Sequence, residues 1–231
     1  MSRLGHVKRF YELLSELEQR SPGIHRLADC HAQMRWPKRG VYFFMENDEI
    51  RRDSGAGPRI VRIGTHALKA GAKSTLWGRL SQHKGQLRSG GGNHRGSIFR
   101  LVVGTALIRR DGLEYPSWGR GSSALSEVRD REKPLERRVS EVIGNMHILC
   151  IAVEDQPGPN SLRGFIERNS ISLLSNHIRN AIDPPSTSWL GHDCNREKMR
   201  SSGLWNTNHV DERYDPSFLD TMATLIRKTG D

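Results

Sequence analysis

An arginine and a histidine, Arg79 and His83, stand four residues apart in a stretch where Leu76 and Leu80 recur at helical spacing. On an ideal helix the two polar side chains lie side by side at the edge of the leucine line, so both can face one cleft. A guanidinium offers paired donors to the non-bridging oxygens of a phosphodiester, and an imidazole can contact a phosphate or relay a proton. A solvated basic helix face would show the same spacing, so the pair alone leaves both interpretations open.

A glutamate in a second helical pattern is the other candidate. Ile171 and Leu174 fall close to the angular position of Glu167, which places its carboxylate against apolar neighbours. A buried carboxylate needs a cation or strong donors nearby. Arg163, one turn earlier, could supply a salt bridge, and a divalent metal ion could equally be bound. Mg²⁺ takes oxygen ligands and keeps several waters, so one carboxylate together with substrate phosphate oxygens would be a sufficient site.

The elements that must position these side chains follow from apolar periodicity and turn residues. The pattern first predicts a helix over 10–17, a strand over 41–45, a loop over 47–59 and a return strand over 60–64. A helix over 75–84 capped by Ser74, a flexible glycine-rich loop over 89–97 and a third strand over 98–108 follow. The remaining elements are a helix over 135–142, a strand over 146–153, a helix over 162–175 capped by Ser161, and a last helix over 218–227. The 146–153 strand is apolar on both faces and should be covered on both sides. This order predicts a mixed α+β fold.

Composition points to a polyanionic partner. The chain of 231 residues has 36 Lys and Arg against 26 Asp and Glu, a net charge of +10. No segment approaches the length of continuous apolar sequence that a membrane span needs, so nucleic acid is favoured over a membrane surface. Three cysteines without a CxxC pair and the absence of a signal-type N-terminus predict a cytoplasmic protein. A phosphate-binding loop ending at Lys73 would need glycine at positions that hold Ala67 and Ala72, which excludes nucleotide hydrolysis.

Two short motifs, Gly40-Val41-Tyr42 and Arg62-Ile63-Gly64, precede the helical pair and the glutamate. In this order, and with Asn176 as a late polar residue, the set resembles the active site of GIY-YIG nucleases over about residues 39–176. The resemblance implies a small three-stranded sheet flanked by helices, Tyr42 contacting the attacking water, and Glu167 binding Mg²⁺ or Mn²⁺. The chain departs from the family at Arg62, where members usually carry tyrosine. Asn176 could equally be a helix C-cap.

The resemblance also frames the domain and partner predictions. We expect an N-terminal helical extension over 1–38, a nuclease-like core over 39–180, and a C-terminal extension over 181–231 that packs on the core. Basic residues that flank the site or lie in the glycine-rich loop are expected to contact nucleic acid: His66, Lys69, Lys73, Arg88, His94 and Arg95. The long insertion before the helical pair looks more like restriction-type or stand-alone members. Oligomeric state does not follow from the sequence.

The catalytic hypothesis is a metal-dependent endonuclease acting on DNA, most simply double-stranded. Its catalytic set comprises Tyr42, Arg62, Arg79, His83, Glu167 and Asn176. Arg62 also motivates an alternative, a catalytically silent nucleic-acid-binding protein on the same scaffold. A nuclease directed at RNA is the third possibility.

Overall fold

A four-stranded antiparallel sheet forms the centre of the computed structural model, which describes residues 1–229. Its strands are β1 (His25–Arg26), β2 (Gly40–Ile50), β3 (Pro58–Gly64) and β4 (His147–Ala152), in the spatial order β1-β4-β2-β3. The predicted α+β class is confirmed. The sheet has one strand more than the three-stranded sheet that the resemblance implies, because the two-residue β1 pairs with β4.

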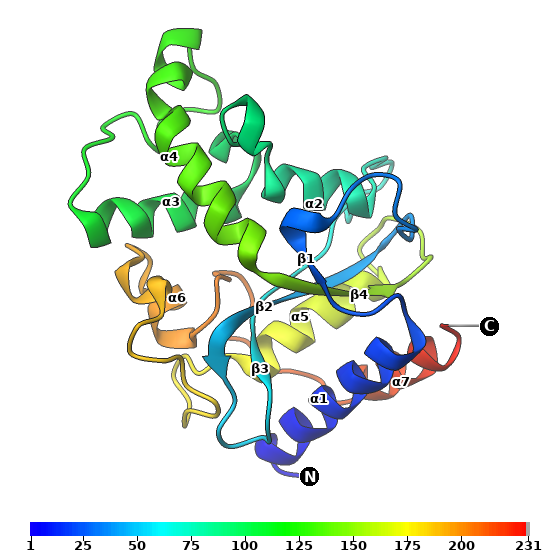
Figure 1. Cartoon of the computed structure of the whole chain (residues 1–231). Coiled ribbons are helices and arrows are strands. Elements are labelled where there is room, and N and C mark those ends of the chain that lie inside the picture. The colour runs from blue at the N-terminus through cyan, green and yellow to red at the C-terminus, as the bar shows by residue number, and fades with distance from the viewer. Residues whose placement is uncertain (230–231) are drawn as a thin grey trace.

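Helices cover both faces of this sheet (Figure 1). One face carries α1 (Arg3–Arg20), α5 (Leu162–Leu174) and α7 (Phe218–Arg227), and the other carries α2 (Leu76–Lys84), α3 (Ile98–Asp111) and α4 (Ser126–Asn145). The remaining helix is the short α6 (Glu197–Ser202). Four 3₁₀ turns complete the regular elements: η1 (Leu27–Asp29), η2 (Leu87–Ser89), η3 (His94–Gly96) and η4 (Leu190–Asp193). None of the helices in the described part is long and apolar enough to cross a membrane.

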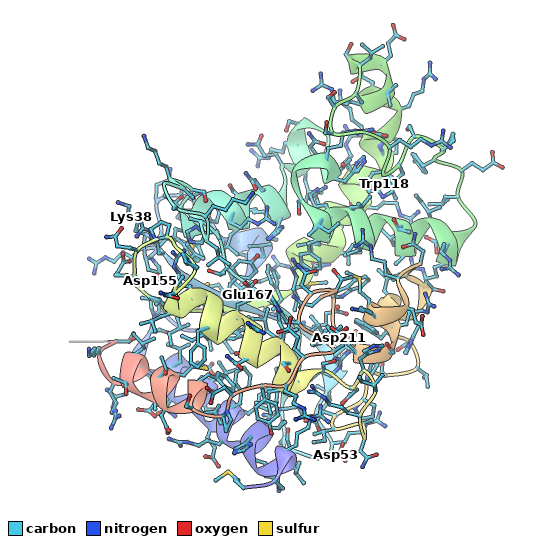
Figure 2. All side chains as sticks on the ribbon, turned by 180° about the vertical axis from the view of Figure 1, so that it is seen from behind. Lys38, Asp53, Trp118, Asp155, Glu167 and Asp211 are labelled. Atoms are coloured by element: carbon cyan, nitrogen blue, oxygen red, sulfur yellow. The ribbon has the colours of Figure 1, made fainter. Side chains whose placement is uncertain are left out.

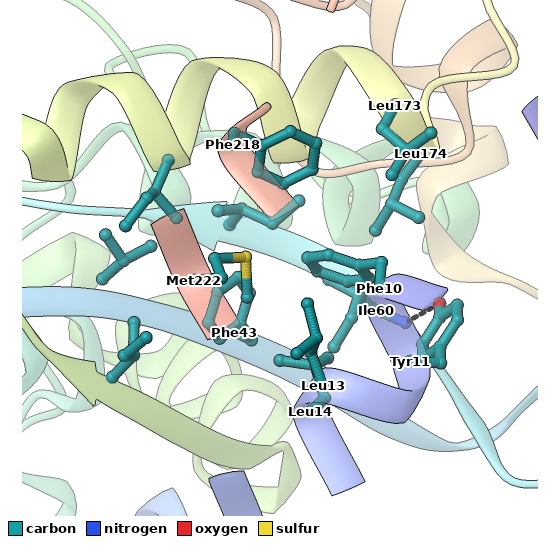
Figure 3. Close-up of a cluster of buried hydrophobic side chains, with 14 of the residues drawn as sticks. Phe10, Tyr11, Leu13, Leu14, Phe43, Ile60, Leu173, Leu174, Phe218 and Met222 are labelled. Carbon is teal, nitrogen blue, oxygen red and sulfur yellow. Dashed lines mark hydrogen bonds between the residues drawn. The ribbon is translucent and has the colours of Figure 1, made fainter. Parts of the chain in front are cut away.

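Alternation along β2 divides the interior into two cores. Val41 and Phe43 point into the core under α1, α5 and α7, which we call the α5-side core (Figure 3). Tyr42 and Phe44 point into the core under α2, α3 and α4, the α3-side core. Because side chains of a strand alternate between faces, neighbouring residues of one motif serve opposite cores.

The prediction of a third strand over 98–108 is wrong, because this segment is helix α3. Its buried residues recur at three- and four-residue intervals, which is helical periodicity hidden in an almost continuous apolar run. Ser97 caps the helix by accepting from the backbone N–H of Arg100, and Gly112 ends it in a left-handed conformation. Helix α2, which precedes α3, also starts differently from expectation, since Thr75 rather than Ser74 is its N-cap.

The glycine-rich segment before α3 is ordered rather than loose. It holds the turns η2 and η3, and Gln86 forms an isolated bridge with Gly91. An added Cβ at Gly91 would lie 2.4 Å from the backbone of Glu136, so this glycine lets the segment lie directly on α4. Within the predicted flexible loop, Gly91, His94 and Ser97 are therefore buried against the fold, whereas Ser89, Gly92, Asn93 and Gly96 are exposed.

Residues near Trp205 close the outer edge of β3. The Trp205 N–H donates to the carbonyl of Val61 at 2.7 Å. The Asn206 side chain accepts from the Ile63 N–H at 3.1 Å and donates to the Ile63 carbonyl at 2.8 Å. A segment far along the chain thus satisfies the free backbone groups of an edge strand.

Candidate active site

The two motif glycines are explained by close approaches. Strand pairing sets Tyr42 opposite Gly64, and a Cβ at Gly64 would lie 2.3 Å from the Tyr42 hydroxyl oxygen. At the other motif a Cβ on Gly40 would lie 2.4 Å from the carbonyl oxygen of Ile151 on β4. Glycine is therefore required at both positions, and the second fixes where the phenol ring lies.

His83 reaches this phenol from α2. Its Nε2 lies 2.9 Å from the Tyr42 hydroxyl and its Nδ1 lies 2.7 Å from the hydroxyl of Ser97. Burial lowers the pKa of His83 well below its usual 6.5, and the charges of Arg62 and Arg79 lower it further. The imidazole is consequently neutral at pH 7. In the tautomer that donates from Nδ1 to Ser97, Nε2 accepts the phenolic proton.

Arg62 and Arg79 bring two positive charges to the same phenol. Arg62 is buried, donates to the Trp205 carbonyl, and holds its guanidinium carbon 4.5 Å from the centre of the Phe99 ring. Arg79 is partly exposed and donates to the Gly96 carbonyl at 3.3 Å. Within residues 1–229 neither guanidinium forms an ion pair with a carboxylate.

Together these charges do not lower the pKa of Tyr42. Burial of the ring raises it above its usual 10, and this effect exceeds the opposing effects of Arg62 and Arg79. Proton transfer from Tyr42 needs an acceptor in contact with the phenol, which is the position that His83 holds.

Glu167 reaches the end of β3 from α5 (Figure 2). Its Oε1 accepts from the backbone N–H of Thr65 at 3.1 Å, and the Thr65 hydroxyl donates to the Gly40 carbonyl at 2.7 Å. The alternative salt bridge to Arg163 does not form, because Arg163 pairs with Asp155. Loss of hydration raises the pKa of Glu167, against the opposing charges of Arg62 and His209.

The donor set suits a hard divalent cation bound at one protein oxygen. No donor from residues 1–229 contacts Oε2 of Glu167, and no group of three or more His, Cys, Asp or Glu side chains suited to a metal occurs in that range. A carboxylate with one oxygen held and the other without a protein partner fits Mg²⁺ or Mn²⁺ that retains water ligands.

A comparison with protein-family models gives one match, a GIY-YIG domain that spans residues 1–231. The chain belongs to the GIY-YIG family. No curated protein and no solved structure shows a significant match. The family is one of nucleases that act on nucleic acid and generally use a divalent metal. Its match reaches beyond the motif region and includes both terminal segments.

Asn176 lies apart from the other residues of this GIY-YIG site. Its Oδ1 accepts from the Ile182 N–H at 2.9 Å and from Arg3 at 3.1 Å. Since Glu167 is seven residues before the end of α5, Asn176 lies more than about 10 Å away along the helix axis. Ser175 occupies the C-cap position. Asn176 instead holds the 176–182 turn against the N-terminal helix.

Two residues expected to contact nucleic acid are engaged inside the fold. His94 is buried, its Nδ1 lies 2.9 Å from Glu136, and its ring stacks on Trp118 at 3.8 Å between centroids. Arg95 forms a buried ion pair with Glu132 at 2.6 Å. Figure 2 places Trp118 far from Glu167, so this cluster anchors α4 at a distance from the GIY-YIG site.

The remaining four positions divide by exposure. His66 is buried with Nδ1 3.0 Å from the Ser74 carbonyl, and burial with the charge of Arg163 lowers its pKa to about 4. Lys69, Lys73 and Arg88 are exposed. These three cations remain available to phosphates, whereas His66 acts as a neutral group that holds the loop before α2.

Several residues around the site carry no sequence signal of their own. Ser97 and Thr65 look like ordinary loop residues, and Trp205 lies far beyond the motifs. His209 adopts a left-handed backbone conformation with φ of 65°, and its Nδ1 lies 2.8 Å from Glu212. Only a cluster of polar turn residues from Asn206 onward could have hinted that this segment approaches Glu167.

Proposed function

We propose that this GIY-YIG protein is a divalent-metal-dependent endonuclease that hydrolyses phosphodiester bonds in DNA. The observation that carries the proposal is the convergence of Arg62 and Arg79, without carboxylate partners, on the buried Tyr42–His83 contact. A buried guanidinium without an anion, as in Arg62, is costly, and a phosphodiester is an anion that Arg62 and the partly exposed Arg79 would accommodate together. The net charge of +10 favours the same substrate class.

In the proposed reaction Tyr42 positions the attacking water and takes its proton as the oxygen attacks phosphorus. The phenol passes its own proton to Nε2 of His83, 2.9 Å away, so no free phenolate has to exist beforehand. Ser97 holds the imidazole in the tautomer that accepts this proton. The raised pKa of Tyr42 is compatible with this concerted transfer, because the phenol stays neutral in the resting enzyme.

Arg79 and Arg62 differ in their proposed tasks. Arg79 is partly exposed and can contact a non-bridging oxygen directly. Arg62 is held by the Trp205 carbonyl and the Phe99 ring, so it contributes a fixed charge that favours the phosphoryl negative charge of the transition state. Glu167 would hold the metal ion, whose chemistry when bound is stabilisation of the leaving oxygen.

Cleavage of supercoiled plasmid by the purified protein tests this proposal. Nicked or linear product that requires Mg²⁺ or Mn²⁺, disappears with EDTA and is lost in Glu167→Gln is expected. Glu212→Gln, which changes a carboxylate next to α5 without touching Glu167, is the matched control and should retain metal-dependent cleavage. Product that is unchanged in Glu167→Gln would overturn the assignment of the metal ligand.

One observation favours a second candidate function. Arg62, which replaces the usual tyrosine, is tied to the Trp205 carbonyl and offers no hydroxyl. A protein that binds nucleic acid without cutting would show salt-dependent retention of DNA and no nicking with any divalent metal. Parallel assays with DNA and RNA of the same sequence distinguish a DNA nuclease from one directed at RNA.

A further inference from the structure

Acidic residues are missing from the part of the chain that surrounds α2. No Asp or Glu occurs between Asp53 and Asp111, a stretch that contains eleven Lys and Arg. Some of these cations are paired with carboxylates from elsewhere in the fold. The five cations from position 69 to 88 form no ion pair within residues 1–229: Lys69, Lys73, Arg79, Lys84 and Arg88. Positive charge on this surface is therefore uncompensated.

The exposed side of α2 is flat at its centre. Its buried line consists of Leu76, Leu80 and His83. At 100° per residue Gly78 lies nearly opposite that line, with Trp77 on one flank and Arg79 on the other. Since Gly78 has no side chain, a strand that crosses α2 between the proposed catalytic Arg79 and Trp77 can approach the helix backbone closely there.

Trp77 is presented as a firm aromatic surface. Its ring stacks on Trp36 with 5.2 Å between centroids and 20° between planes. The Trp36 indole donates to the His31 carbonyl at 2.9 Å, and the Leu76 N–H donates to the Lys38 carbonyl at 3.1 Å, which ties this segment to the start of α2. Both indoles are partly exposed.

Beyond Trp77 lies a hollow of about 690 Å³ without acidic residues in its lining. Its cationic residues are Lys84 and Arg88, with His31 opposite and Gln82 and Gln86 as amides. An aromatic ring beside cations and amides is suited to an unpaired nucleobase and its phosphate, because bases stack on aromatic rings whereas paired bases are not accessible.

We propose that DNA extends from the cleavage site across Gly78 and that an unpaired nucleotide next to the cut stacks on Trp77, with its phosphates at Lys84 and Arg88. The proposal rests on the proposed nuclease function and specifies its substrate class. Preferred substrates are duplexes that carry an unpaired stretch at the scissile position, in preference to uninterrupted duplex.

Fluorescence anisotropy of the full chain in EDTA tests the proposal without cleavage. Three labelled probes are compared: a short duplex, the same duplex with an unpaired tail, and the same duplex with a tail of abasic nucleotides. The normal tail should tighten binding about tenfold relative to the duplex. The abasic tail, which keeps the phosphates, should recover only part of this gain.

Variants separate stacking from structural packing. Trp77→Phe keeps an aromatic face and should retain most of the tail effect, whereas Trp77→Leu keeps apolar bulk and should lose it. Trp118→Phe, at the distant stack with His94, is the control and should bind like the wild type. Melting temperatures of all variants verify folding. Equal affinity for normal and abasic tails, or equal losses for duplex and tailed DNA in Trp77→Leu, would overturn the proposal.

The outcome is distinguishable from failure of the proposed function. Tail-dependent binding without metal-dependent cleavage of either the plasmid or the tailed duplex would refute the nuclease and support the Trp77 surface. Cleavage of plasmid without any tail preference would support the nuclease and refute the Trp77 surface.

Discussion

The two faces of the sheet are built from the same strands but carry cores of different chemistry. Apolar side chains of the α5-side core pack through contacts such as Phe10 with Phe43, whose ring centroids lie 5.7 Å apart, and the Tyr11 hydroxyl accepts from the Ile60 N–H there (Figure 3). The α3-side core encloses ionisable groups, among them His83, Arg62 and Arg100. One face therefore stabilises the molecule, which allows the other to hold charges that are costly to bury.

Tyr42→Phe, a change in the α3-side core, should have the largest effect on activity. Removal of the hydroxyl deletes both the contact to water and the 2.9 Å contact with His83. We expect a loss of about 10²–10⁴-fold in cleavage rate with little change in melting temperature. Single-turnover cleavage together with thermal unfolding measures both. Near-normal cleavage by this variant would remove Tyr42 from the mechanism.

Phe43→Ala should destabilise the α5-side core. The residue next to Tyr42 is fully buried in the α5-side core. Its truncation should lower the free energy of unfolding by about 3–5 kcal/mol, measured by denaturant titration. At temperatures where the variant remains folded, we expect cleavage per folded molecule close to the wild-type value. A selective loss of activity instead would show that the two cores are not separable.

Gly64→Ala sharpens the comparison because one added atom affects both stability and catalysis. The added Cβ would lie 2.3 Å from the Tyr42 hydroxyl oxygen and must displace the ring. Overpacking of this kind costs about 1–3 kcal/mol. We expect that cost in unfolding experiments and a loss of cleavage from misplacement of the phenol. Gly112→Ala, whose added Cβ meets nothing within 4 Å but which has a left-handed backbone, controls for stability loss without ring displacement.

Glu167→Gln should have the smallest effect on stability, and one of opposite sign. Burial raises the pKa of Glu167, so the ionised carboxylate opposes folding at neutral pH. The amide can still accept from Thr65, and the melting temperature should rise by roughly 2–4 °C for each kcal/mol gained. The sign follows from linkage: the gain is present above the folded-state pKa and disappears as pH falls toward the ordinary value of 4.5. A gain that persists in acid would identify packing rather than charge as its cause.

Sequence patterns predicted the parts of the fold that depend on local chemistry. Turn residues and alternation located the β2–β3 hairpin, and Ser161 caps α5 as expected. The 98–108 segment failed because an apolar run does not distinguish a buried strand from a buried helix. Within the candidate site, His83 contacts Tyr42, and the charges of Arg62, Arg79 and Glu167 act on the pKa of Tyr42. Their roles remain predictions.

The rest of the site depends on tertiary contacts that no local pattern encodes. Ser97 acts on His83 only because the fold places the N-cap of α3 beside the last turn of α2. Trp205 meets Arg62 only because a remote segment lies along β3. Conversely, His94 and Arg95 looked like mobile basic residues among glycines but found carboxylate partners on α4. Pairing of a cation depends on what packs against it, which spacing along the chain does not reveal.

The contact between Trp205 and β3 also determines when the site can assemble during translation. Arg62 and Ile63 leave the ribosome long before the residues that hold them, since Trp205 and Asn206 each lie 143 residues further along the chain. Until then the β3 edge is open and Arg62 has no carbonyl to anchor it. A growing chain therefore carries the GIY-YIG motifs without their assembled centre until Trp205 and Asn206 have been added.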